Sequence, residues 1–222
     1  MASLVGSRVE RKEDKRFLTG KGRYTADINI ANQTYAAFIR SPHARAKIKK
    51  IDSSKALKAS GVVEILTGEH IANDKIGGLI AGWAIRSEDG SEMKCPPNPP
   101  LAKDNANFVG EPVAVVFAET LDEARAAAEL VKVDYKVLKA VTSLADTMKS
   151  EAIHEGIEKN LCYDWLLGDR QKVKEAFDKA DKIIKLDHIN NRLVPNAMEP
   201  RACVVDYNTA SEEITCYTTS QN

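Results

Sequence analysis

The alternation of apolar and polar residues divides the first part of the chain into short strands and a helix. Residues 34–41 hold the apolar run Tyr-Ala-Ala-Phe-Ile before a Ser-Pro pair, and residues 46–52 alternate isoleucines with lysines, so both segments are predicted to be strands. Residues 53–60 follow with a serine cap and stop at Gly61, a pattern typical of a short helix. The β-branched segment 62–66 predicts a third strand.

The clearest pattern lies between residues 108 and 138. Residues 113–117 form an apolar run that suits a buried strand, and Thr120-Leu-Asp-Glu123 is a capping box that opens an alanine-rich helix ending at Leu130. Residues 131–137 then alternate at strand spacing. Strand, helix and strand in such a short stretch are a βαβ signature, so we expect an α/β module whose alanine-rich helix packs on a sheet.

Less regular segments surround this module. Residues 7–33 are polar and basic and predict an extended lead-in with little core of its own. Residues 76–103 contain glycines and the run Cys-Pro-Pro-Asn-Pro-Pro, which can continue neither a helix nor a central strand. Residues 139–168 are mixed and polar, and we interpret them as a linker.

The last third of the chain predicts one helix and a second β element. Asp169 can cap a helix on which Val173, Ala176, Phe177 and Ala180 recur at helical spacing, which gives it one apolar face to bury. Strands are predicted at 182–188, 202–207 and 214–218, with a turn at 208–212. An isolated hairpin is marginal in water, so we expect further chain or another subunit to cover it. We therefore infer a second domain that is only begun.

Composition narrows the class of protein. The chain has 222 residues, 43% of them hydrophobic and 29% charged, which suffices for a real core. Because 32 Lys and Arg balance 32 Asp and Glu, no net charge favours nucleic acid or an anionic membrane, and small molecules or other proteins are the expected partners. No apolar window is long enough for a membrane span and the start lacks the apolar core of a signal peptide, so we expect a cytoplasmic protein.

The sequence lacks the motifs that are typical of several kinds of metal site and enzyme. The four cysteines lie far apart without a Cys-x-x-Cys pair, so no zinc ribbon or iron–sulfur binding run is predicted, and we expect four reduced, structural thiols. The four histidines share no close spacing, and we assign none of them a metal. Neither Gly-x-Ser-x-Gly nor a Walker-type loop is present, which disfavours a generic hydrolase or NTPase.

Five stretches together resemble one family. RFLTGKGRYTAD at 16–27, AFIRSPHAR at 37–45 and GVVEILTG at 61–68 resemble, in order, the opening of molybdenum hydroxylase large subunits of the xanthine oxidase, aldehyde oxidase and aerobic carbon monoxide dehydrogenase family. FVGEPVAVV at 108–116, with the alanine-rich helix and VDY at 133–135, resembles the end of its α/β hammerhead domain. NRLVPNAMEPR at 191–201 and TTSQN at 218–222 resemble the start of its molybdopterin-binding domain.

The resemblance implies an α/β (α+β) fold and a division into domains. We expect an extended lead-in at 1–19, a hammerhead domain at 20–142, a linker with one helix at 143–181, and the truncated beginning of a molybdopterin-binding domain at 182–222. The parent subunit would hold a molybdopterin-type molybdenum cofactor and hydroxylate a small-molecule substrate oxidatively, passing electrons to iron–sulfur and FAD subunits. The family's cofactor loop and catalytic glutamate lie downstream, so no catalytic, cofactor-binding or metal-binding residue is assigned here.

Glu111 is the first candidate for a substrate-funnel or domain-interface residue. Gly110-Glu111-Pro112 precedes a buried strand, and the simplest interpretation is a turn in which Gly gives backbone freedom and Pro fixes φ. The resemblance offers a second interpretation, because the hammerhead domain covers the cofactor domain in this family. Glu111 would then lie on the lip of the funnel and contact a polar group of the substrate or an arginine.

Glu199 and Arg201 are the other candidates of the same kind. An adjacent acid and base can simply pair with neighbours at the mouth of a sheet. In xanthine and aldehyde oxidase relatives a glutamine several residues before the matching glutamate approaches the molybdenum centre, and residues 192–198 contain none here. This departure argues against a purine or aldehyde oxidase proper. The competing hypothesis for the whole chain is a split or truncated gene product that acts as a non-catalytic module docking on a separate cofactor-binding chain.

Overall fold

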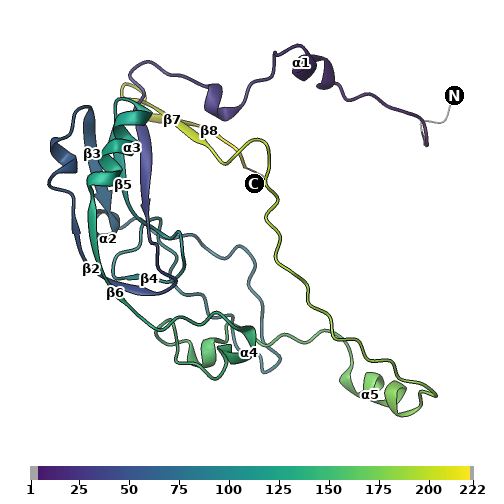
Figure 1. Ribbon diagram of the computed structural model, residues 1–222. Coiled ribbons are helices and arrows are strands. Elements are labelled where there is room, and N and C mark those ends of the chain that lie inside the picture. The colour runs from purple at the N-terminus through teal and green to yellow at the C-terminus, as the bar shows by residue number, and fades with distance from the viewer. Residues whose placement is uncertain (1–4, 221–222) are drawn as a thin grey trace. The chain divides into compact units, whose positions relative to one another are not determined.

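The computed structural model describes residues 5–220, which form two compact units (Figure 1). The larger unit runs from Thr34 to Lys185. The smaller unit combines the N-terminal residues up to Gln33 with the residues from Leu186 onward. The last two residues of the TTSQN stretch lie outside the described part.

The first sheet of the larger unit has β5 at its centre. Strands β1 (Tyr35–Arg40), β5 (Pro112–Ala118) and β3 (Val62–Thr67) pair antiparallel in the order β1-β5-β3. Val113, Ala114, Val116 and Ala118 are fully buried. A strand covered on both faces needs apolar residues at every position, which is the pattern that predicted a buried strand here. All three strands predicted in this sheet are confirmed.

The second sheet differs from the topology predicted from the sequence. Strands β4 (Asn105–Ala106), β2 (Ala46–Asp52) and β6 (Lys132–Val137) pair antiparallel in the order β4-β2-β6. Strands β5 and β6 therefore lie in different sheets, and the βαβ unit predicted for residues 108–138 is wrong as a parallel crossover. The physical reason is that β6 alternates half-buried and exposed residues, which suits an antiparallel strand with one polar face.

Helix α3 (Leu121–Leu130) packs on the first sheet, against β1 and β5 (Figure 1). Ala124 and Ala127 are fully buried, and their small side chains let the helix approach the sheet closely. Thr120 caps the helix by accepting from the Glu123 N–H at 3.2 Å and donating its hydroxyl to the Glu123 carboxylate at 2.8 Å. The predicted Thr120 cap and helix end are confirmed, although the Glu123 carboxylate accepts from the Thr120 hydroxyl and not, as in a full capping box, from the Thr120 backbone N–H.

The short helix predicted at residues 53–60 is smaller than expected. Only a single 3-10 turn, η2 (Ala56–Lys58), forms there, and Gly61 follows with a φ of +71°. Helix α2 (Gly68–Asn73), which the sequence pattern did not predict, follows β3 directly. A Cβ on Gly68 would lie 2.6 Å from the Ala102 carbonyl oxygen, so only glycine fits this close backbone approach.

The remaining parts of the larger unit are mainly irregular. Residues 76–103 contain an isolated β-bridge between Arg86 and Glu92. The predicted linker carries α4 (Leu144–Thr147) and η3 (Glu158–Asn160), followed by α5 (Arg170–Asp178). Asp169 caps α5 as predicted, accepting from the Lys172 N–H at 3.0 Å. No residue of α5 is buried.

The smaller unit is built on one hairpin. Strands β7 (Cys203–Asn208) and β8 (Glu213–Thr218) pair antiparallel, which confirms the two strands predicted there. The lead-in contains α1 (Asp14–Leu18) and the 3-10 turn η1 (Thr25–Asp27). The strand predicted at 182–188 is wrong, because its apolar residues find no partner strand in the described part of the chain and a strand needs one to satisfy its backbone. No described residue of this unit is buried.

Candidate functional site

Glu111 lies at the turn that leads into β5. Its side chain is 6% exposed, and one carboxylate oxygen, Oε2, accepts a hydrogen bond from the backbone N–H of Asn107. Its carbonyl accepts from the Ser41 N–H at 2.9 Å. Glu111 thus closes the loop from Asn107 to Pro112 upon itself. These contacts correspond to the turn interpretation of the motif.

The neighbours of Glu111 tie the same turn to the end of β1. The Gly110 N–H donates to the Ser41 carbonyl at 2.8 Å, and the Arg40 guanidinium donates to the Gly110 carbonyl at 2.9 Å. Gly110 has a φ of +89°, a conformation that favours glycine. The register of β1 against β5 shifts at this point. The Gly-Glu-Pro motif therefore sets where β5 begins, and of the two carboxylate oxygens of Glu111 it is Oε2 that the turn uses.

Glu199 performs a comparable task in the smaller unit. Its Oε1 accepts from the Thr25 N–H at 3.0 Å, at the first residue of η1. This hydrogen bond joins the lead-in to the segment that precedes β7, two parts of the chain separated by more than 170 positions in sequence. A carboxylate at the first turn of a helix satisfies an N–H that has no partner within the helix. Glu199 thereby holds the smaller unit together.

Arg201 is exposed and forms no ion pair with the residues described here. The adjacent acid and base are therefore not paired with each other: Glu199 contacts the backbone of η1, and the guanidinium of Arg201 projects from the start of the hairpin. Glu111 belongs to the larger unit, whereas Glu199 and Arg201 belong to the smaller one.

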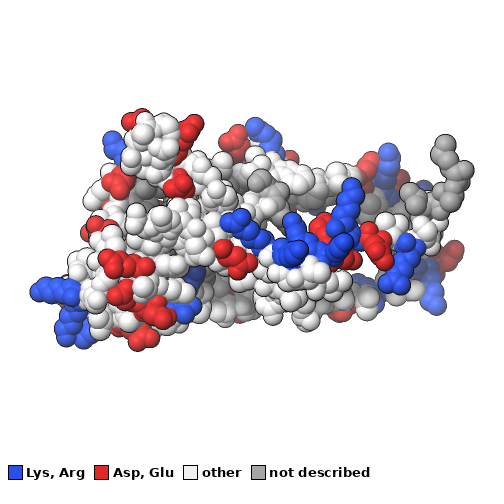
Figure 2. All heavy atoms as spheres, turned by 90° about the horizontal axis from the view of Figure 1, so that it is seen from above, with Lys and Arg blue, Asp and Glu red and all other residues white. Residues whose placement is uncertain are grey.

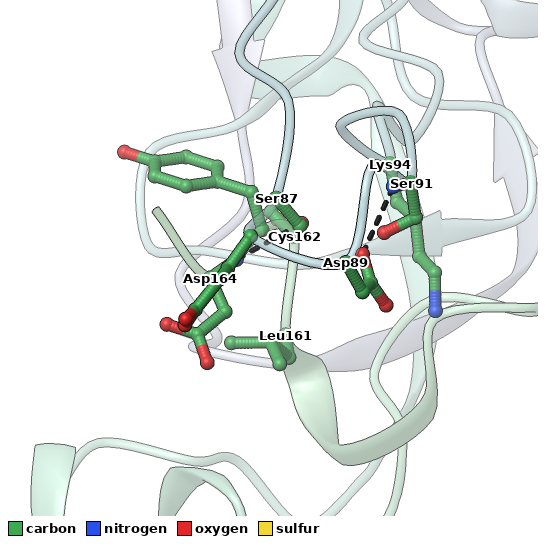
Figure 3. Close-up of a pocket in the computed structure, with 9 residues that line it drawn as sticks. Ser87, Asp89, Ser91, Lys94, Leu161, Cys162 and Asp164 are labelled. Carbon is green, nitrogen blue, oxygen red and sulfur yellow. Dashed lines mark hydrogen bonds between the residues drawn. The ribbon is translucent and has the colours of Figure 1, made fainter. Parts of the chain in front are cut away.

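A groove in the larger unit is a hollow that sequence reasoning missed (Figure 3). It has a volume of about 400 Å³ and lies between residues 87–94 and residues 161–164. Two backbone hydrogen bonds hold these segments together: Glu88 N–H to the Asp164 carbonyl at 2.8 Å and Lys94 N–H to the Cys162 carbonyl at 2.9 Å. These hydrogen bonds join two loops that are far apart in sequence, so no local sequence pattern predicts them.

The groove is mainly acidic in its charged groups. Glu88, Asp89 and Asp164 line it together with one basic residue, Lys94 (Figure 3). The Glu88 carboxylate is paired with the Arg170 guanidinium. Hydrogen bonds from the hydroxyl and N–H of Ser91 hold the pKa of Asp89 below its ordinary value. Such a surface suits hydrogen-bond donors or cations. However, no group of three or more His, Cys, Asp or Glu suited to a metal ion exists among residues 5–220.

A second hollow of about 400 Å³ lies beside β2 and the start of α2. His70 is fixed there, because its Nδ1 accepts from the Thr67 N–H at 3.1 Å. Lys49, Lys50 and Lys103 line the same hollow together with Glu69 and Asp104, so its charges are mixed. The face shown in Figure 2 also carries a mixture of acidic and basic side chains.

Comparison with known proteins places the chain in a family. A model of the a/b hammerhead domain of aldehyde oxidase and xanthine dehydrogenase matches residues 19–139, and a model of the molybdopterin cofactor-binding domain matches residues 153–222. The two antiparallel sheets with α3 are thus a hammerhead domain, and the hairpin belongs to a cofactor-binding domain. The chain belongs to the aldehyde oxidase and xanthine dehydrogenase family of molybdenum hydroxylases.

Its relatives are much longer than the chain itself. It is 31% identical to the nicotine 6-hydroxylase large subunit of Paenarthrobacter nicotinovorans, over 99% of this chain and 26% of that protein. It is 30% identical to the carbon monoxide dehydrogenase large chain of Afipia carboxidovorans, over 98% of this chain and 27% of that protein. The chain therefore spans about a quarter of the length of these relatives.

Solved structures of similar proteins are also much longer than this chain. Quinoline 2-oxidoreductase from Pseudomonas putida 86 is similar with a TM-score of 0.80 at 30% identity, covering 97% of this chain and 27% of that one. The Cu,Mo-CO dehydrogenase is similar with a TM-score of 0.81 at 28% identity, covering 96% and 27%. The family uses a molybdopterin-type molybdenum cofactor. Among the described residues, none of the helices has the length and apolar character needed to cross a membrane.

The residues present do not build a molybdopterin site by themselves. A cofactor site is concave and has several converging polar groups. In the matched part of the cofactor-binding domain, the residues from Leu186 to Ser220 are one hairpin and an extended segment, and none of those described is buried. The two hollows described above lie in the larger unit. No catalytic step through the cofactor follows from these residues.

Proposed function

We propose that this chain supplies the hammerhead domain and the first strands of the molybdopterin-binding domain to a molybdenum hydroxylase large subunit of the carbon monoxide dehydrogenase type. The parent enzyme would hydroxylate a small-molecule substrate oxidatively and pass electrons to iron–sulfur and FAD subunits in the cytoplasm. The domain limits proposed are 20–142 for the hammerhead domain, 143–181 for the linker and 182–222 for the start of the cofactor domain. The chain alone is inactive in this proposal.

One contrast carries the proposal. The hammerhead part encloses its own core, with Val113, Val116 and Ala127 fully buried, whereas the β7–β8 hairpin buries nothing among the described residues. Tyr207, Ile214 and Tyr217 of the hairpin remain 54%, 69% and 43% exposed. Apolar strands of this kind require a covering layer. The remainder of a large subunit, or a separate chain that holds the cofactor, would supply it.

Glu111, Glu199 and Arg201 are proposed to face other parts of the assembled enzyme. Glu111 has one oxygen engaged by the Asn107 N–H and Glu199 has one engaged by the Thr25 N–H, so each carboxylate keeps a second oxygen for a polar substrate group or an arginine. The exposed guanidinium of Arg201 suits a carboxylate of an adjoining domain. In the complete enzyme, E111Q would change substrate saturation if Glu111 lines the funnel.

The experiment is purification of the 222-residue chain from a host that makes molybdenum cofactor, followed by metal analysis and assay. We expect far less than one molybdenum per chain and no substrate oxidation. Stoichiometric molybdenum with activity would refute the absence of catalytic residues. The same preparation tests the alternative of a non-catalytic docking module: co-purification of a separate, cofactor-carrying chain would establish it. The coding sequence beyond Asn222 then shows whether one gene encodes both parts.

A further inference from the structure

The β7–β8 hairpin brings two cysteines together that are 13 positions apart in sequence. Cys203 pairs with Thr218 and Val205 pairs with Cys216, so Cys203 and Cys216 are diagonal neighbours on one face of the hairpin. Their sulfur atoms lie 3.5 Å apart, and both residues are exposed. The sulfur atoms must approach by about a further 1.5 Å to bond. Because diagonal neighbours lie about 7–8 Å apart across a sheet, closure requires side-chain rotation together with a small adjustment of the two strands.

We propose that Cys203 and Cys216 form a redox-active dithiol that closes to a disulfide across the hairpin by exchange with a small disulfide such as oxidised glutathione. The geometry distinguishes this pair from Cys95 and Cys162, which are also exposed but have no cysteine partner in the described structure. The proposal gives this pair a role beyond the four reduced, structural thiols expected from the sequence; all four are free and exposed. It concerns the 222-residue chain by itself, because Cys203 and Cys216 share a face of the hairpin with Tyr207 and Ile214, which the proposed function expects to be covered in the assembled enzyme.

The exchange proceeds in two balanced steps. One cysteine thiolate attacks a sulfur of oxidised glutathione, forming a mixed disulfide and releasing one glutathione thiolate. The second cysteine, deprotonated in turn, attacks the protein sulfur of that mixed disulfide and releases the second glutathione. The two protein thiols lose two protons and two electrons, and one oxidised glutathione becomes two molecules of reduced glutathione.

The local environment sets the pH dependence of this exchange. Burial raises the pKa of the Cys203 thiol, and its hydrogen bond with Cys216 raises it further. Besides the cysteines, the titratable groups of the two strands are Asp206, Tyr207, Glu213 and Tyr217, and Arg201 lies two positions before Cys203. Among the described residues, Cys216 is the group whose hydrogen bond and charge act on the pKa of Cys203. Because the thiolate is the attacking species, the exchange rate is expected to increase with pH.

The test is incubation of the 222-residue chain with oxidised glutathione, alkylation of the remaining thiols and peptide mapping by mass spectrometry. We expect a Cys203–Cys216 crosslink, while Cys95 and Cys162 carry only glutathione adducts and serve as internal references. In C203S, and equally in C216S, the remaining cysteine of the pair should accumulate the glutathione adduct. A C95S/C162S double variant should form the crosslink as the unaltered chain does.

The proposal requires that the folded hairpin favours formation of the Cys203–Cys216 disulfide. The equilibrium constant for forming this disulfide from oxidised glutathione is therefore measured with and without denaturant. We expect it to be at least about tenfold higher in the native chain, because the hairpin raises the effective concentration of one thiol at the other. Equal constants in the two conditions would overturn the proposal. So would glutathione adducts on Cys203 and Cys216 at the level of the reference cysteines without a crosslink.

Discussion

At the scale of single residues, the burial of Glu111 is the most informative contact in the larger unit. It is the only buried charged side chain among the residues described, and its carboxylate satisfies the half-buried N–H of Asn107. A buried donor that loses its acceptor destabilises a fold more than a surface contact does. The motif Gly110-Glu111-Pro112 is thus explained structurally before any substrate is considered.

Replacing Glu111 tests that explanation. E111A should lower the free energy of unfolding by about 1–3 kcal/mol, because the Asn107 N–H is left without an acceptor. E111Q keeps an oxygen acceptor of the same size and should cost less than E111A. Urea unfolding followed by circular dichroism measures both values. If E111A is as stable as the unaltered chain, the turn does not depend on this carboxylate.

Tyr135 predicts a pH dependence of stability. Burial raises the pKa of its phenol above the ordinary value, and the Ser41 hydroxyl offsets only part of that rise. A raised pKa in the fold means that the native state holds its proton more tightly than the unfolded state. The contribution of Tyr135 to the free energy of unfolding is therefore fully present below the pKa of the unfolded state, about 10. It is lost as the pH rises through the pKa of the folded state.

The variant Y135F isolates this effect. The Ser41 hydroxyl donates to the His43 carbonyl, and the buried phenol oxygen has no hydrogen-bond partner in the described structure. Removal of the phenol oxygen should therefore leave stability at neutral pH equal or slightly higher. Between about pH 9 and 11 the unaltered chain should lose more stability than Y135F. Unfolding free energies measured across this range give the difference. Parallel curves for the two proteins would contradict the assignment.

At the scale of elements, two capped helices of similar length differ in what they cover. The α3 helix buries Ala124 and Ala127 on the first sheet, whereas α5 leaves Val173 and Phe177 54% and 55% exposed. Helix propensity and capping make both segments helical, but short helices obtain most of their stability from packing. The two caps, Thr120 and Asp169, therefore make a matched pair for mutation.

T120A should lower the global free energy of unfolding by about 1 kcal/mol, because the cap supports a helix that closes the core. D169A should shift global unfolding by less than about 0.5 kcal/mol while increasing hydrogen exchange within α5, because no buried residue depends on that helix. Urea unfolding and amide exchange distinguish the two. A global loss of equal size in D169A would show that α5 is packed in solution.

At the scale of the whole chain, stability is concentrated in one unit. Every buried residue described lies in the larger unit, which contains two apolar clusters, one around Val116 and one around Val113. A fragment of residues 34–185 should therefore unfold cooperatively, with a midpoint within a few degrees of that of the 222-residue chain. Thermal unfolding by circular dichroism measures both. A fragment without a cooperative transition would show that the smaller unit is required for folding.

The sequence by itself determined the elements that carry strong local patterns. The apolar run of β5, the capping box at Thr120 and the hairpin strands were predictable, because burial on both faces, helix capping and strand alternation each leave a signature within a few residues. The resemblance to molybdenum hydroxylases was likewise predictable from motifs in order, and the comparisons confirm it.

Only the tertiary structure decided how these elements are combined. Whether β6 joins β5 or β2, whether residues 182–188 find a partner strand, and which loops enclose the groove near Asp89 all depend on contacts between distant segments. The same holds for the two sulfur atoms of Cys203 and Cys216 and for the acceptor role of Glu199. Local patterns record what a residue must bury or expose, but they do not record which distant segment will cover it.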